Sequence, residues 1–173
     1  MPVLTATSRR ELEVHRFPAL VYALVPLAAL VLQAWLPRVM GRYAWFDLPL
    51  VVVIYFAMGR PSPIQGTVMG CILGIFEDAL TQHPIGINGV AKTLIGFLAS
   101  SVGIRVDVEN HTVRVLLTLA LSLASSGIYF FVFRILLGLS LAWNWLDALL
   151  VAIGNTVLAL ILFPFLDRFR IRD

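Results

Sequence analysis

The side chains that could carry chemistry in this chain are a few charged groups inside apolar segments. Glu77 and Asp78 end one such segment, and Lys92 lies about one and a half turns into the next. Charged groups are costly at membrane depth, so acidic and basic residues there are expected to pair. Asp78 and Lys92 flank a turn at comparable distances. We therefore expect an intramembrane ion pair of Glu77 or Asp78 with Lys92, unless Lys92 extends its long side chain outward to water.

A second pair of opposite charges flanks a later turn. Arg134 lies toward the end of one apolar segment, and Asp147 lies near the start of the next. We expect these two residues to form an ion pair that fastens the segments together on the outer side of a membrane. Two independent side chains at the membrane surface would give the same sequence pattern.

No set of catalytic residues converges anywhere in the sequence. The three histidines (His15, His83 and His111) are scattered and lack the spacing of metal ligands. The phosphate-binding and nucleophile motifs Walker A, G-x-G-x-x-G and G-x-S-x-G do not occur. The single cysteine, Cys71, permits no intrachain disulfide. We expect a protein that is not an enzyme and that binds no metal or cofactor.

A stripe of small residues runs along the segment that ends in Asp78. Gly66, Gly70, Gly74 and Asp78 are four residues apart, so a helix places them on one face. The remaining positions are apolar all round, as in a helix inside a core or a membrane. In lipid, such a stripe lets a second helix approach closely. That helix could belong to this chain, or it could be the transmembrane helix of a partner whose depth Asp78 fixes.

Composition indicates one integral membrane domain. The chain has 173 residues, of which 60% are hydrophobic and 13% charged, with a mean hydropathy of +0.91. We expect an all-α fold in which residues 17–167 form a bundle of six transmembrane helices between a cytoplasmic tail (1–16) and a basic cytoplasmic tail (168–173). The expected helices cover residues 17–37, 47–59, 64–80, 87–102, 114–139 and 144–167. The second is short for a span and should be tilted or partly submerged, and residues 104–109 alternate as in a brief extended segment.

The distribution of positive charge predicts the orientation of the bundle. Nine of the 13 Lys and Arg residues fall in the two tails, at Arg60 and between residues 105 and 114, whereas only Arg38 and Arg42 fall in the opposite connections. The positive-inside rule therefore places both termini in the cytoplasm and explains the basic composition without nucleic acid. The four tryptophans (Trp35, Trp45, Trp143 and Trp145) would then form one belt at the outer interface.

The glycine-striped helix that ends at Asp78, followed by Pro84-x-Gly86-x-Asn88 in a turn, resembles the MreD family of bacterial rod shape-determining membrane proteins. The resemblance implies a non-enzymatic scaffold in the inner membrane that supports lateral peptidoglycan synthesis and cell shape. The implied partners are an MreC-type single-span coiled-coil protein and the elongation complex, including a RodA-type polymerase, a class B penicillin-binding protein and MreB.

The resemblance also implies a fold similar to the S components of energy-coupling-factor transporters. An alternative function is therefore that of a substrate-binding membrane subunit in such a vitamin transporter. That alternative predicts a polar pocket near the outer face, which the tryptophans could line.

Overall fold

The computed structural model describes residues 18–40, 45–59, 62–82, 84–136, 138 and 143–170, and these residues form helices and turns without any strand. The six α-helices are α1 (Ala19–Met40), α2 (Leu48–Met58), α3 (Pro63–Thr81), α4 (Ile87–Gly103), α5 (His111–Phe131) and α6 (Trp145–Asp167), and a π-helical turn, Val132–Leu136, continues α5. The prediction of an all-α fold with six helices is confirmed. The predicted cytoplasmic tail, residues 1–16, and residues 171–173 of the basic tail lie outside the described residues.

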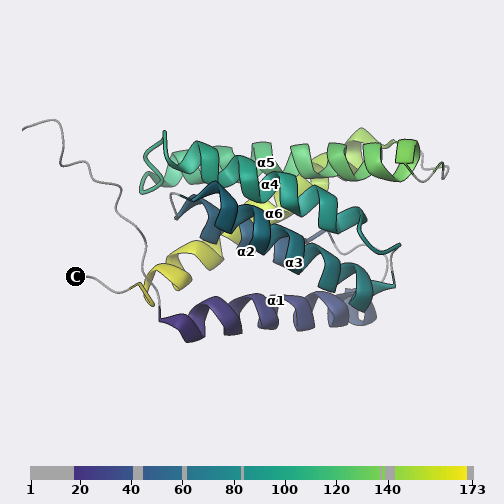
Figure 1. The fold of residues 1–173 in the computed structure, drawn as a ribbon. Helices are drawn as coiled ribbons and strands as arrows, with labels where there is room; N and C mark the ends of the chain where they lie inside the picture. Colours follow the sequence, from purple (N-terminus) through teal and green to yellow (C-terminus); the bar gives the residue numbers. More distant parts are fainter. Residues whose placement is uncertain are drawn as a thin grey trace, which may run out of the picture.

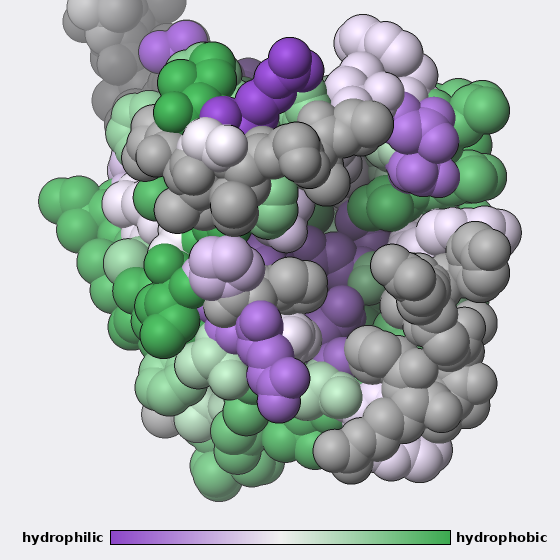
Figure 2. All heavy atoms as spheres, turned by 90° about the vertical axis from the view of Figure 1, so that its right-hand side faces the viewer, coloured by the Kyte–Doolittle hydropathy of each residue, from purple (hydrophilic) through white to green (hydrophobic). Residues whose placement is uncertain are grey.

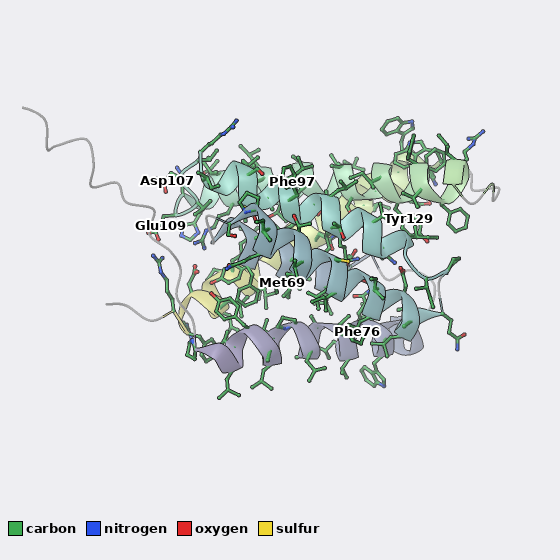
Figure 3. The ribbon with its side chains drawn as sticks, in the orientation of Figure 1. Met69, Phe76, Phe97, Asp107, Glu109 and Tyr129 are labelled. Atoms are coloured by element: carbon green, nitrogen blue, oxygen red, sulfur yellow. The ribbon has the colours of Figure 1, made fainter. Side chains whose placement is uncertain are left out.

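The helices run back and forth along one direction, so that α1 begins and α6 ends at the same end of the bundle (Figure 1). We call this the inner end, because it is the end predicted to face the cytoplasm, and the opposite one the outer end. Asp107 and Glu109 lie at the inner end and Tyr129 lies toward the outer end (Figure 3). By the bounds of their helices, all four tryptophans lie near the outer end.

Helix α2 is the buried centre of the molecule. Every residue from Pro49 to Met58 is buried, and α2 contacts all five other α-helices. Asp47 starts the helix, because its Oδ1 accepts the backbone N–H of Leu50 at 2.9 Å, as an N-cap side chain does. Its 11 residues extend about 16 Å, roughly half of the ~30 Å hydrocarbon thickness. This helix is therefore too short to span, and protein encloses it on all sides.

The outer surface of the bundle is strongly apolar. Exposed large side chains include Leu20, Leu24, Leu27 and Val31 on α1, Ile64, Val68 and Ile72 on α3, and Val157, Leu160 and Ile161 on α6. Such continuous apolar surface is rare on a protein in water and is typical of contact with lipid. Two helical segments, His111–Ile135 and Trp145–Asp167, are long and apolar enough to cross a membrane.

The link between α4 and α5 differs from the sequence expectation. Residues 104–110 form turns rather than an extended segment. Helix α5 begins at His111, three residues before the predicted start, because the Asn110 side chain accepts the backbone N–H of Thr112 at 2.9 Å and caps the helix. The alternation of apolar and polar residues here therefore accompanies turns and no strand.

Candidate functional site

The glycine stripe of α3 faces α4, and these two helices make the most extensive helix contact in the bundle. Gly66, Gly70 and Gly74 are buried. A Cβ atom at Gly70 would overlap the backbone carbonyl of Lys92, and one at Gly74 would overlap that of Asn88. The contact is therefore backbone against backbone. Helix α4 covers the stripe, so this face of α3 is not open to a helix of a partner protein.

Asp78 is fully buried where α3 ends, and its carboxylate caps the start of α4. It accepts the backbone N–H groups of Gly86 at 2.8 Å, Asn88 at 3.1 Å and Gly89 at 3.4 Å. The Asn88 side chain adds a fourth bond from Nδ2 to Oδ1 at 2.8 Å. The first N–H groups of a helix lack partners within it and favour negative charge. Asp78 therefore supplies, from the neighbouring helix, the cap that α4 needs.

The turn between α3 and α4 brings Asp78 to these donors. Gly86 has φ +105°, a left-handed conformation that side chains rarely adopt. Pro84 precedes it, and the Pro84 carbonyl accepts the backbone N–H of Ile87 at 3.5 Å. Pro84, Gly86 and Asn88 thus form one turn closed by Asp78, which gives a physical reason for the spacing of these residues.

Lys92 is fully buried and lies between two carboxylates. Its Nζ atom is 2.6 Å from Oε2 of Glu77 and 2.7 Å from Oδ2 of Asp47. The structure therefore places Lys92 against Glu77 rather than Asp78, whose oxygens are taken by the helix cap. We call Asp47, Glu77 and Lys92 the buried charge cluster. It connects the start of α2 to α3 and α4.

Asp47 is held in place from two more helices. Its backbone N–H donates to Oδ1 of Asn155 on α6 at 2.7 Å. On α1, Gln33 donates from Nε2 to the Phe46 carbonyl at 3.1 Å and accepts the Leu48 N–H at 3.1 Å. These bonds fix the segment before α2, so the carboxylate that meets Lys92 is positioned by side chains of α1 and α6.

Sequence reasoning missed Asp47 as a partner of Lys92, and it missed the supporting roles of Gln33 and Asn155. The available signal was the isolation of these two amides in otherwise apolar helices, since a buried amide needs a hydrogen-bond partner. Lys92 and Asp47 are 45 residues apart in the sequence, and Asp47 and Asn155 are 108 residues apart. No local spacing rule connects positions at such distances.

The expected ion pair between Arg134 and Asp147 is absent from the described residues. The Arg134 guanidinium lies over the Phe130 ring, with Cζ 5.7 Å from the ring centroid, and Asp147 accepts a hydrogen bond from Nδ2 of Asn144 at 3.0 Å. Each charge is satisfied on its own helix: the cation by an aromatic face and the carboxylate at a helix N-terminus.

A separate cluster fastens the inner end. Arg114 Nη1 lies 2.6 Å from Oδ2 of Asp167, and the Tyr55 hydroxyl donates to the other oxygen of Asp167 at 2.8 Å. The Arg114 Nε atom also donates to the Val108 carbonyl. This cluster links α2, α5 and α6, so each end of the central helix is tied to its neighbours by charged groups.

Two sizeable hollows are lined by residues that the structure describes. A polar cavity of about 340 Å³ lies at the outer end between the starts of α2, α4 and α6 and the last turns of α5, and Figure 2 shows hydrophilic walls in a depression at this end. An apolar groove of about 550 Å³ lies between α1, α2 and α3, and is lined by side chains such as Tyr22, Phe56, Val68, Met69 and Ile72. Met69 lies on the side of α3 turned toward α1 (Figure 3).

The arrangement of charges is suited to holding helices together. Both carboxylates of the buried charge cluster share one ammonium, and none of the three groups is bonded to a hydroxyl or thiol of the residues that the structure describes. Within the described ranges, no three His, Cys, Asp or Glu side chains are placed to share a metal ion.

The family model of the rod shape-determining protein MreD matches residues 15–170, nearly the whole chain. No curated protein and no solved structure matches the chain. The turn closed by Asp78 and the contact of the glycine stripe with α4 lie within the matched range. The chain therefore belongs to the MreD family, whose members are membrane proteins that determine rod shape.

Proposed function

We propose that this protein is a non-enzymatic scaffold of the rod elongation complex in the bacterial inner membrane, where it binds an MreC-type single-span protein. Family membership is the observation that carries this proposal. The described charges support it, because the buried groups cap a helix and pair with one another. Through this partner the protein supports lateral peptidoglycan synthesis by a RodA-type polymerase and a class B penicillin-binding protein, together with MreB.

The bundle crosses the membrane with its inner end in the cytoplasm. Helices that alternate in direction and an apolar outer surface support this placement (Figure 1). Arg105, Arg114, Arg168 and Arg170 lie in or beside the turns of the inner end, as the positive-inside rule requires. The short helix α2 is carried within the bundle and makes no lipid-facing span of its own.

The transmembrane helix of the partner docks in the apolar groove between α1 and α3. The glycine stripe is covered by α4, so another surface must receive the partner. The groove is the larger of the two hollows, its lining is mostly apolar, and Val68 and Ile72 on its α3 side are about half exposed. Helix association in lipid depends on close packing, which a concave surface provides.

A bulky residue in the groove tests this docking. Ile72→Trp fills the groove from an exposed position, whereas Ile153→Trp adds the same bulk at an exposed position on α6. Each tagged variant is purified from its native cells in a gentle detergent, and its companions are identified by mass spectrometry. We expect the wild type and Ile153→Trp to recover a single-span coiled-coil protein with wall-synthesis enzymes, and Ile72→Trp to lose them. If the two variants recover the companion proteins equally, the partner helix does not dock in the groove.

A second candidate function is the substrate-binding membrane subunit of an energy-coupling-factor type transporter. The polar cavity at the outer end favours it, because such a subunit needs a polar pocket on that side. The same purification separates the two functions: paired ATPases and a membrane coupling subunit in place of the coiled-coil protein would establish the transporter.

A further inference from the structure

The cavity at the outer end carries an excess of negative charge. Asp47 lines it, and the charge cluster to which Asp47 belongs contains two carboxylates and one ammonium, a formal charge of −1. Asp147 also lines the cavity and is bonded to the neutral amide of Asn144. No lysine or arginine is among the described residues that line the cavity. The walls therefore favour a cation over an anion.

Aromatic rings form part of the same walls. Tyr129 and Phe130 come from α5, and Trp143 precedes α6 with its ring centroid 4.9 Å from that of Phe130. The Trp143 Nε1 atom is buried and has no hydrogen-bond partner among the described residues. Arg134 already lies over the Phe130 ring, so this wall accepts a positive charge within the protein itself.

We propose that this cavity binds an organic ammonium group, held by Asp147 and Asp47 and faced by the rings of Tyr129 and Trp143. Carboxylates combined with aromatic faces are the usual recognition chemistry for ammonium ligands. The volume of about 340 Å³ is at the lower end of the range of small-molecule sites, about 300–1,000 Å³, and suits a headgroup-sized ligand.

The ammonium could come from a soluble amine or from the headgroup of an amine-bearing lipid, since the cavity lies at the outer end of a membrane bundle. The ligand would share Asp47 with Lys92, so its binding would contact the same cluster that holds α2, α3 and α4 together. Binding of an ammonium group by the isolated chain does not depend on which partner proteins are recovered from cells.

The test is a titration of the purified full chain with choline chloride in dodecyl maltoside, with sodium chloride at matched concentration as the control. The measured quantity is the midpoint temperature of unfolding. We expect choline, and not sodium, to raise the midpoint in a saturable way. Asp147→Asn, at an exposed position, should weaken the apparent affinity about tenfold, and Trp143→Ala should do likewise, whereas Trp35→Ala on α1 should leave it unchanged.

A second arm distinguishes the two sources of the ammonium. The same titration is run in lipid nanodiscs of phosphatidylglycerol alone and of phosphatidylglycerol mixed with phosphatidylethanolamine. If choline raises the unfolding midpoint in phosphatidylglycerol alone but raises it less when phosphatidylethanolamine is present, the lipid headgroup competes for the cavity. If choline raises the midpoint equally in both nanodiscs, the ligand is a soluble amine. An unfolding midpoint that responds equally to choline and sodium in every medium would overturn the proposal. Asp147→Asn and Trp143→Ala variants that respond to choline like the wild type would overturn it too.

Discussion

At the scale of single residues, two adjacent acids in α3 have separate structural roles. Glu77 and Asp78 follow one another, and successive positions on a helix differ in direction by about 100°. Glu77 therefore meets Lys92, while Asp78 reaches the N–H groups at the start of α4. Their adjacency in the sequence suggested alternative partners for one lysine. The structure assigns them to two different tasks.

Removing the Asp78 carboxylate should destabilise the fold. Asp78→Ala leaves the buried N–H groups of Asn88 and Gly89 without an acceptor, so we expect the free energy of unfolding to fall by about 2–4 kcal/mol. Asp78→Asn should cost less, because its amide oxygen still accepts. The measurement is denaturant unfolding in detergent micelles, with the exposed Asp107→Ala as the control. A loss no greater than that of the control would contradict the capping role.

Removing the Lys92 ammonium should be at least as costly. Lys92→Met leaves the buried carboxylate of Glu77 and the partly exposed carboxylate of Asp47 with no cation between them, and we expect a loss of about 3–5 kcal/mol in the free energy of unfolding. Adding Glu77→Gln to Lys92→Met should restore part of this loss, since one of the unpaired charges is then removed. The double-mutant cycle measures this coupling, and strictly additive losses would show that the ion pair with Glu77 contributes nothing.

At the scale of helices, the glycine spacing indicated a close contact but did not identify the second helix. Gly96 on α4 faces the stripe, and a Cβ there would overlap the Gly66 carbonyl. The tight turn through Gly86 makes α4 the nearest available partner of α3, which explains why the contact is internal. Cβ atoms at Gly70, Gly74 and Gly96 would meet backbone atoms, which cannot move aside as flexible side chains can.

A single methyl group should therefore discriminate between packed and open glycines. Gly70→Ala places Cβ against the Lys92 carbonyl, so we expect a loss of about 1–3 kcal/mol in the free energy of unfolding. Gly127→Ala, in α5 with open space around it, should instead gain up to about 1 kcal/mol from helix propensity. Unfolding curves of the two variants, measured side by side, test whether the free energy of unfolding falls for Gly70→Ala and rises for Gly127→Ala. Equal effects would mean that the α3–α4 contact is looser than the structure shows.

At the scale of the whole molecule, the sequence predicted the helices better than it predicted their contacts. Apolar runs and charged turns marked six helices, and Asp78 with Gly86 marked a hairpin, because those signals are local. The burial of α2 on all sides and the pairing of Asp47 with Lys92 depend on helices that are distant in the sequence. The expected ion pair between Arg134 and Asp147 was wrong for a related reason. Two residues that flank a turn need not point toward each other.

The orientation of the bundle is open to direct measurement. In a Cys71→Ser background, Ile85→Cys places a thiol in the exposed α3–α4 turn at the outer end, and Asp107→Cys places one in the exposed α4–α5 link at the inner end. In intact spheroplasts, a membrane-impermeant maleimide should label Ile85→Cys and leave Asp107→Cys unlabelled. Both should react after the membrane is opened, which controls for exposure. The reverse pattern would place the polar cavity on the cytoplasmic side, and labelling of both in intact spheroplasts would rule out a bundle that spans the membrane with these two turns on opposite sides.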